Sequence, residues 1–71
     1  MIKDKVLFEM KMVERGYTYR KLASAIGCSV TTLNQKVNHD IDFRLWETER
    51  LADVLDLTLE EYLRIFIRKK F

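Results

Sequence analysis

The chain contains no proline, only two glycines and a single cysteine. Proline and glycine mark the turns of sheet proteins, so their scarcity favours helices, as does the frequency of Leu, Glu, Lys, Arg and Ala. Cys28 alone forms no internal disulfide, and with His39 the only histidine there is no cluster of zinc ligands. We therefore expect an all-α protein suited to a reducing compartment, with no metal, other cofactor or small-molecule ligand.

Long apolar runs are also missing, and two acids and two lysines interrupt the first ten residues, MIKDKVLFEM. This pattern predicts neither a membrane span nor a signal peptide. The 71 residues show no linker-like change of composition, and 48% of them are hydrophobic. We expect one small intracellular domain over residues 1–71, with a core of its own.

Charge is unevenly distributed along the chain. Residues 1–38 carry seven Lys and Arg against three Asp and Glu, whereas residues 39–71 carry six against eight. The asymmetry permits a basic face toward a polyanion, but ordinary solvated helix surfaces explain it equally well.

Three helices are predicted in the first half of the chain. The first covers residues 4–15 and stops at Gly16, and its apolar positions form the stripe Val6, Leu7, Met10 and Val13. Thr18 is the expected N-cap of the second helix, which ends at Gly27, and Ser29 is the expected N-cap of the third. The buried positions expected in these two helices are Leu22, Ala23, Ile26, Val30, Leu33 and Val37.

Two more helices are predicted in the second half, over residues 44–55 and 58–67. Glu47 lies three residues after Arg44, where many helices have a Ser or Thr cap, and Asp42 is an alternative cap. Thr58 and Glu61 have the spacing of a capping box. Trp46 is expected to pack on the core, as is one face of the last helix with Leu59, Leu63 and Phe66.

Residues 18–38 have the pattern of a helix-turn-helix, because a three-residue connection forces two helices to cross steeply. On a helical wheel, Val30, Leu33 and Val37 of the third helix share one side. The opposite side and its margins carry hydrogen-bonding side chains, namely Thr31, Asn34, Gln35, Lys36 and Asn38. No acid occurs from Ala23 to His39. This absence favours DNA binding, because a carboxylate there would be repelled by DNA phosphates.

The segment YRKLASAIGCSVTTLNQKVN resembles the helix-turn-helix of the lambda-repressor-like family, the phage repressor and Cro type (XRE-like). The following DFRLWETERLADVLDLTLEEYL is similar to the fourth and fifth helices of that family. The resemblance implies a compact five-helix domain that places its third helix in the major groove of double-stranded DNA. In three respects the chain departs from the family pattern: NHD stands where NGK is frequent, Arg44 stands where the fourth helix usually has a Ser or Thr cap, and Lys36 stands where many members have an apolar residue.

Carried onto this chain, the resemblance implies base contacts from Val30, Thr31, Asn34 and Gln35. It implies backbone contacts from Tyr19, Arg20, Thr32, Lys36, Asn38 and Arg44. For Val30, the alternative to a thymine contact is packing in the core. For Tyr19, the alternative to a phosphate contact is packing between helices. Asp40 and Asp42 place negative charge near the expected phosphate path.

The last helix is apolar on more than one side, which suggests a partner surface. We expect homodimerisation through Tyr62, Ile65, Phe66, Ile67 and Phe71, with purely internal burial as the alternative. A dimer would read two operator half-sites about 34 Å apart.

These features favour a sequence-specific transcription regulator, of the kind of a phage or bacterial Cro-like repressor, in the cytoplasm of a bacterial host and associated with its nucleoid. The alternative is a protein-interaction module, such as an antitoxin or antirepressor, that uses the hydrophobic C-terminal helix. Enzyme activity is not expected, since there is no nucleophile near a histidine in a legible motif and no phosphate-binding glycine loop.

Overall fold

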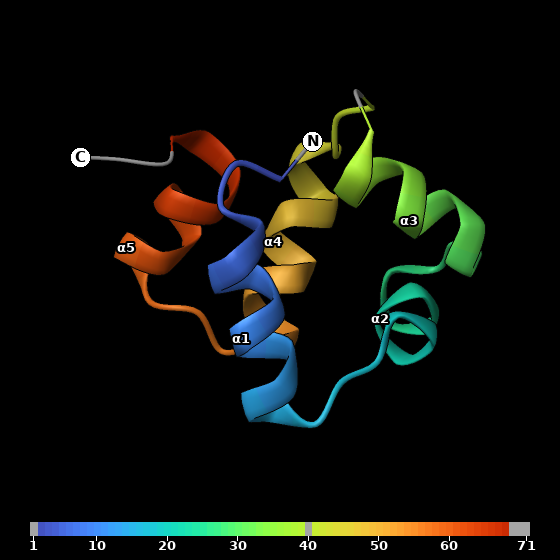
Figure 1. The fold of residues 1–71 in the computed structure, drawn as a ribbon, viewed down its shortest axis with the longest axis horizontal. Coiled ribbons are helices and arrows are strands. Elements are labelled where there is room, and N and C mark those ends of the chain that lie inside the picture. The colour runs from blue at the N-terminus through green and yellow to red at the C-terminus, as the bar shows by residue number, and fades with distance from the viewer. Residues whose placement is uncertain (1, 40, 69–71) are drawn as a thin grey trace.

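The computed structural model describes residues 2–39 and 41–68, and all regular structure within them is helical. The elements are α1 (Lys5–Arg15), α2 (Tyr19–Ile26), α3 (Val30–Asn38), α4 (Leu45–Val54), α5 (Leu59–Tyr62) and a π-helical turn η1 (Leu63–Ile67). Figure 1 shows α2 and α3 together on one side of the molecule and α5 on the other, with α1 and α4 between them. The expected all-α, five-helix fold is confirmed.

The helix ends follow the local signals in the sequence. The Thr18 side chain accepts a hydrogen bond from the Lys21 N–H at 3.2 Å, and Ser29 Oγ accepts one from the Thr32 N–H at 3.1 Å. Gly27 ends α2 in the left-handed region, with φ of 75°. These contacts satisfy backbone groups that the helix itself leaves unpaired. Both ends of α2 and the start of α3 are therefore fixed by short-range chemistry.

Thr58 and Glu61 form the predicted capping box at the start of α5. The Thr58 N–H donates to Glu61 Oε1 at 2.9 Å, and the Glu61 N–H donates to Thr58 Oγ1 at 3.2 Å. At α4 the N-cap is Arg44, whose N–H donates to Glu47 Oε1 at 2.8 Å. Asp42, the alternative considered, is not the N-cap.

The core lies where α1, α2, α3, α4 and η1 meet. Its fully enclosed side chains are Phe8, Leu22, Leu33, Val37, Leu51, Leu55 and Ile65. Burial of these groups supplies the main favourable free energy of folding.

The stripe predicted for α1 is largely wrong. Val6, Met10 and Val13 are 70%, 58% and 81% exposed, whereas Phe8 is fully buried and Met12 is 6% exposed. The helix carries apolar residues on two sides, and the side that contains the aromatic ring faces the core. Of the predicted set, only Leu7 packs partly against the core.

Two further packing predictions are wrong. Trp46 is 54% exposed and Leu59 is 74% exposed. The buried side of α4 is formed by Glu47, Thr48 and Leu51, and Trp46 is not part of it. Thr48 Oγ1 lies 2.8 Å from the Tyr62 hydroxyl, so a polar contact joins α4 to α5 there.

The last predicted helix is divided into one α-helical turn and the π-helical turn η1. The Arg68 N–H donates to the Leu63 carbonyl at 2.8 Å, and the Lys3 N–H donates to the Ile65 carbonyl at 2.7 Å. The segment before α1 therefore runs beside η1. None of the helices within residues 2–39 and 41–68 combines the length and apolarity needed to cross a membrane.

Candidate nucleic-acid interface

The turn between α2 and α3 is held by backbone bonds and one small side chain. The Cys28 N–H donates to the Ala23 carbonyl at 2.9 Å, which closes the end of α2. Ala23 itself is 2% exposed, as expected from its place among the predicted buried positions, and its small side chain allows the two helices to cross closely. This arrangement presents α3 at the edge of the molecule (Figure 1).

The two sides of α3 differ as predicted, except that Val30, which was expected on the buried side, is exposed. Leu33 is fully buried and Val37 is 2% exposed, so this side of the helix is anchored in the core. On the other side, Thr31, Asn34 and Gln35 are exposed. Val30 is 43% exposed, which leaves its methyl groups accessible at the first turn.

Asn38 organises the polar face near the end of α3. Its amide donates to the backbone carbonyl of Asn34 at 3.2 Å and to the side-chain oxygen of the same residue. Asn34 therefore presents its amide in a fixed orientation, with its oxygen already accepting one bond.

Tyr19 lies between the core and the polar face. Its ring is half-buried and packs against the core cluster. Burial raises the pKa of the Tyr19 phenol, the charge of Glu9 adds to this rise, and a hydrogen bond with Asn38 partly offsets it. The phenol is thus a neutral hydrogen-bonding group at physiological pH, linking the start of α2 to the end of α3.

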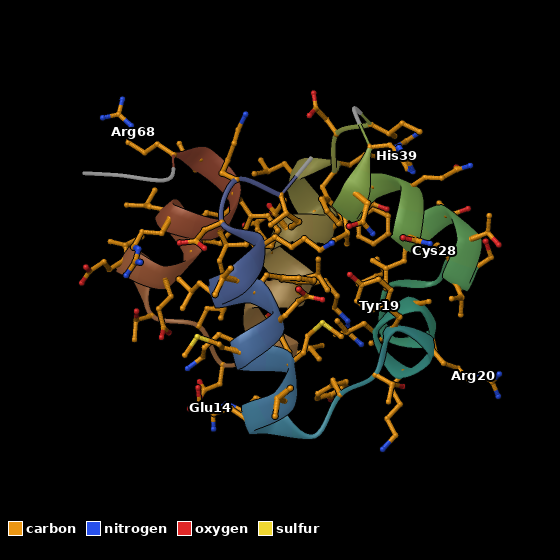
Figure 2. The ribbon with its side chains drawn as sticks, viewed as in Figure 1. Glu14, Tyr19, Arg20, Cys28, His39 and Arg68 are labelled. Atoms are coloured by element: carbon orange, nitrogen blue, oxygen red, sulfur yellow. The ribbon has the colours of Figure 1, made fainter. Side chains whose placement is uncertain are left out.

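Exposed cations flank this face at the start of α2. Arg20 and Lys21 are both exposed. In Figure 2 the Arg20 side chain points away from the body on the side of α2 and α3, whereas Arg68 extends from the opposite end of the molecule. Arg20 is therefore available to an anion that approaches α3.

Thr32 and Arg44, the two other predicted backbone contacts in this region, differ in exposure. Thr32 is half-buried, and its hydroxyl accepts a hydrogen bond from Ser29 Oγ at 2.9 Å. The Arg44 side chain is exposed just before α4. Asp40, which was expected near the phosphate path, lies outside the described residues, and His39 is the exposed C-cap of α3.

Lys36 is turned inward, unlike the other polar side chains of α3. Its ammonium lies 2.7 Å from both carboxylate oxygens of Glu47 and 5.8 Å from the centre of the Phe43 ring. The expected role as a free backbone anchor does not match this placement. No local sequence pattern indicates this pair, because the two residues lie in different helices.

The Glu47 carboxylate is stabilised in its charged form despite its burial. Burial pushes its pKa up, but hydrogen bonds from Lys36 and the Arg44 N–H, with the nearby positive charges, outweigh this effect and lower it. Cys28 lies close by, where burial raises the pKa of its thiol, the charge of Lys36 opposes that rise and Glu47 adds to it. The thiol is therefore protonated near neutral pH and poorly reactive.

The residues predicted for dimerisation differ in their exposure. Ile65 is fully buried within the domain, so its prediction as a surface contact is wrong. Ile67 is 53% exposed, while Tyr62 and Phe66 are half-buried. Phe71 lies outside the described residues.

Beside Ile67 is a shallow groove of about 400 Å³ between the start of α4 and the end of η1. The Phe66 ring packs edge-on against Phe43, with 5.9 Å between the ring centres. The groove is lined by Lys3, Asp42, Phe43, Leu45, Thr48, Tyr62, Phe66 and Ile67. In the part of the chain that the structure describes, no three His, Cys, Asp or Glu side chains are grouped so that they could hold a metal ion.

Comparison with known proteins gives one match. Residues 8–66 match the family described as the Cro/C1-type helix-turn-helix (HTH) DNA-binding domain. No curated protein and no solved structure matches the chain significantly. The matched region extends from α1 to η1 and includes both α2 and α3. The chain therefore belongs to the Cro/C1-type HTH DNA-binding domain family.

Proposed function

We propose that this DNA-binding domain is a sequence-specific transcription regulator, a Cro-like repressor that occupies an operator through the major groove and blocks polymerase. The observation that carries the proposal is the outer side of α3, where Thr31, Asn34 and Gln35 are exposed. No acid occurs from Ala23 to His39, so no carboxylate of this segment opposes the approach of phosphates. A helix in this position fits the major groove.

The base-reading group in this proposal consists of Val30, Thr31, Asn34 and Gln35. Gln35 is free to form a bidentate pair with adenine, and a Thr31 or Val30 methyl group suits the methyl of thymine. Asn34 has one side-chain bond to Asn38 and keeps donors available for a base edge.

The backbone contacts in this proposal come from Tyr19, Arg20, Thr32, Asn38 and Arg44. Arg20 and Arg44 are exposed and charged, so they contribute attraction to phosphates. Tyr19, Thr32 and Asn38 are half-buried and contribute hydrogen bonds at fixed positions. We leave Lys36 out of this set because its ammonium is engaged by Glu47.

We also propose that the regulator acts as a homodimer through the edge formed by Tyr62, Phe66 and Ile67. The exposed Ile67 and the groove beside it, which has both polar and apolar lining residues, support this surface. Two copies related by a two-fold axis would read half-sites about 34 Å apart, one turn of DNA. Such a regulator would work in the cytoplasm of a bacterial cell.

Selection from random duplex DNA at physiological salt, followed by footprinting, tests the proposal. The expected result is an enriched motif with two inverted half-sites, whose centres are about 10 base pairs apart. Affinity for it should fall steeply as salt rises. Failure to enrich any motif, or binding that ignores salt, contradicts the proposal.

A second candidate function, a protein-interaction module such as an antitoxin or antirepressor, is supported by the apolar outer side of α1. Val6, Met10 and Val13 are all more than half exposed on this helix. A stoichiometric complex in which α1 amides become protected from hydrogen exchange, together with no affinity for duplex DNA, would favour this function over the first.

A further inference from the structure

The side chain of Lys36 belongs to the reading helix but is enclosed between α3 and α4. It is 13% exposed, and the side chain of Glu47 is 5% exposed. The ammonium donates to both Glu47 oxygens at 2.7 Å. A lysine that left this site for a DNA phosphate would abandon an enclosed carboxylate, which is costly.

Glu47 is itself fixed by the first turn of α4. Its Oε1 accepts the Arg44 N–H at 2.8 Å in addition to the Lys36 ammonium. The carboxylate thus joins two backbones: it holds the start of α4 directly and the second half of α3 through Lys36. Gln35 precedes Lys36 directly, and Asn34 lies two residues before it, so their positions depend on this attachment.

We infer that Lys36 is a positioning residue for base readout, and that its ion pair with Glu47 sets how α3 lies against α4. This inference rests on the proposed function. Lys36 stands where the family resemblance implies an apolar residue, and Val37, which is 2% exposed, makes the buried apolar contact one position later. In this chain, Lys36 acts on DNA recognition through Glu47 and makes no phosphate contact of its own.

The role in recognition is separable from a role in stability. Removing one partner of an enclosed ion pair leaves the other unpaired and destabilises the fold, whereas replacing both partners with apolar residues is often neutral or stabilising. The double variant Lys36→Met/Glu47→Met therefore keeps the test usable if either single variant folds poorly. Arg20→Ala, which removes an exposed cation, is the matched control for a phosphate contact.

The experiment measures the dissociation constants of these variants for the selected motif and for an unrelated duplex at several salt concentrations. For Lys36→Met we expect a roughly tenfold loss of discrimination between the two duplexes. The slope of log affinity against log salt should stay unchanged, whereas Arg20→Ala should lower its magnitude by about one with discrimination retained. The double variant should discriminate no worse than either single variant, because all three remove the same attachment.

Two outcomes of the binding experiment overturn the inference. A lower salt slope for Lys36→Met with full discrimination between the two duplexes would make Lys36 an ordinary phosphate contact. An unchanged salt slope together with unchanged discrimination would give Lys36 no role in DNA recognition.

A second readout needs no DNA. The amides of residues 34–38 should exchange hydrogen faster in Lys36→Met and in the double variant than in wild type or Arg20→Ala, and equal exchange rates also overturn the inference. If wild type enriches no motif, the proposed function fails, while the exchange rates still decide whether the pair holds α3.

Discussion

Glu47 Oε1 accepts a hydrogen bond from the Arg44 N–H at 2.8 Å, three residues earlier in the chain. The same carboxylate receives the Lys36 ammonium. Glu47 therefore satisfies a backbone donor at the start of α4 and neutralises an enclosed charge from α3. Its protonation should disturb both helices at once, which makes stability dependent on pH.

The free energy of unfolding should fall in acid because of Glu47. The pKa of Glu47 is lowered in the folded state, so its ionised form stabilises the protein at pH above the unfolded value of about 4.3. This contribution is lost as pH falls from there through the folded pKa. The groups facing the carboxylate are Lys36, Arg44 and Cys28. Urea denaturation at a series of pH values measures the effect.

Glu47→Gln is the control for this prediction. At neutral pH it should be less stable than wild type, since Lys36 loses its charged partner, and the two stability curves should approach one another as pH falls through the lowered pKa of Glu47. Parallel curves would show that Glu47 is not responsible. Glu61, whose pKa is also lowered, contributes a fall of the same sign in both proteins.

Gln35→Ala should relax base preference at one position of each half-site. Loss of a bidentate base contact costs about 1–3 kcal/mol for the preferred base. Binding to a set of motif variants, each with one changed base pair, locates the affected position. Glu60→Ala, an exposed change on α5, should leave preference unaltered. An equal loss of affinity at every sequence would contradict a base-reading role for Gln35.

Arg20→Ala should weaken binding to all sequences alike. Removal of one phosphate contact lowers the magnitude of the salt slope by about one. Arg68→Ala removes an exposed arginine at the opposite end of the molecule and should leave the slope unchanged (Figure 2). Equal slopes for the two variants would place the DNA-binding surface elsewhere.

Ile65 and Ile67 should respond differently to substitution. Ile65→Ala opens a cavity at a fully buried position and should cost about 2–5 kcal/mol of unfolding free energy. Ile67→Ser changes an exposed position, so its effect on monomer stability should stay within about 0.5 kcal/mol while self-association weakens. Denaturation and sedimentation equilibrium measure the two properties. Unaltered self-association in Ile67→Ser would remove Ile67 from the proposed dimer surface.

Gly27→Ala should destabilise the domain through the backbone alone. A β-carbon at this position meets no heavy atom within 4 Å, but φ is 75°. The left-handed conformation costs a residue with a β-carbon about 1–2 kcal/mol. Gly27→Asn should cost less, because asparagine tolerates this region better. Thermal denaturation of the two variants that shows equal losses would assign the cost to another cause.

The features that could be predicted from the sequence are those with short-range causes. Thr18, Ser29 and Thr58 cap helices through bonds to residues three positions later, and Gly27 ends α2 by its own conformational freedom. The division of α3 into a buried and an exposed side also follows from helical periodicity. For that reason most of the candidate interface could be named before the structure was known.

Features that depend on tertiary packing were predicted less well. Periodicity showed that α1 has apolar residues, but not which of its two apolar sides packs inward; Phe8 decided this against Val13. The break between α5 and η1 turns Ile65 into the core, a result that a continuous helix does not predict. Lys36 and Glu47 are eleven positions apart on separate helices, so only the folded structure brings them together.

The attachment of α3 to α4 has a consequence for exchanging reading helices between members of the family. Transplanting residues 30–38 into another framework would carry Lys36 without Glu47 and leave the lysine ammonium without its carboxylate partner. Transplanting a foreign α3 with an apolar residue at position 36 into this chain would leave the enclosed Glu47 carboxylate without the Lys36 ammonium. A graft from this chain should therefore include the first turn of α4 as well as α3. If Lys36 and Glu47 are moved together, α3 should keep its orientation.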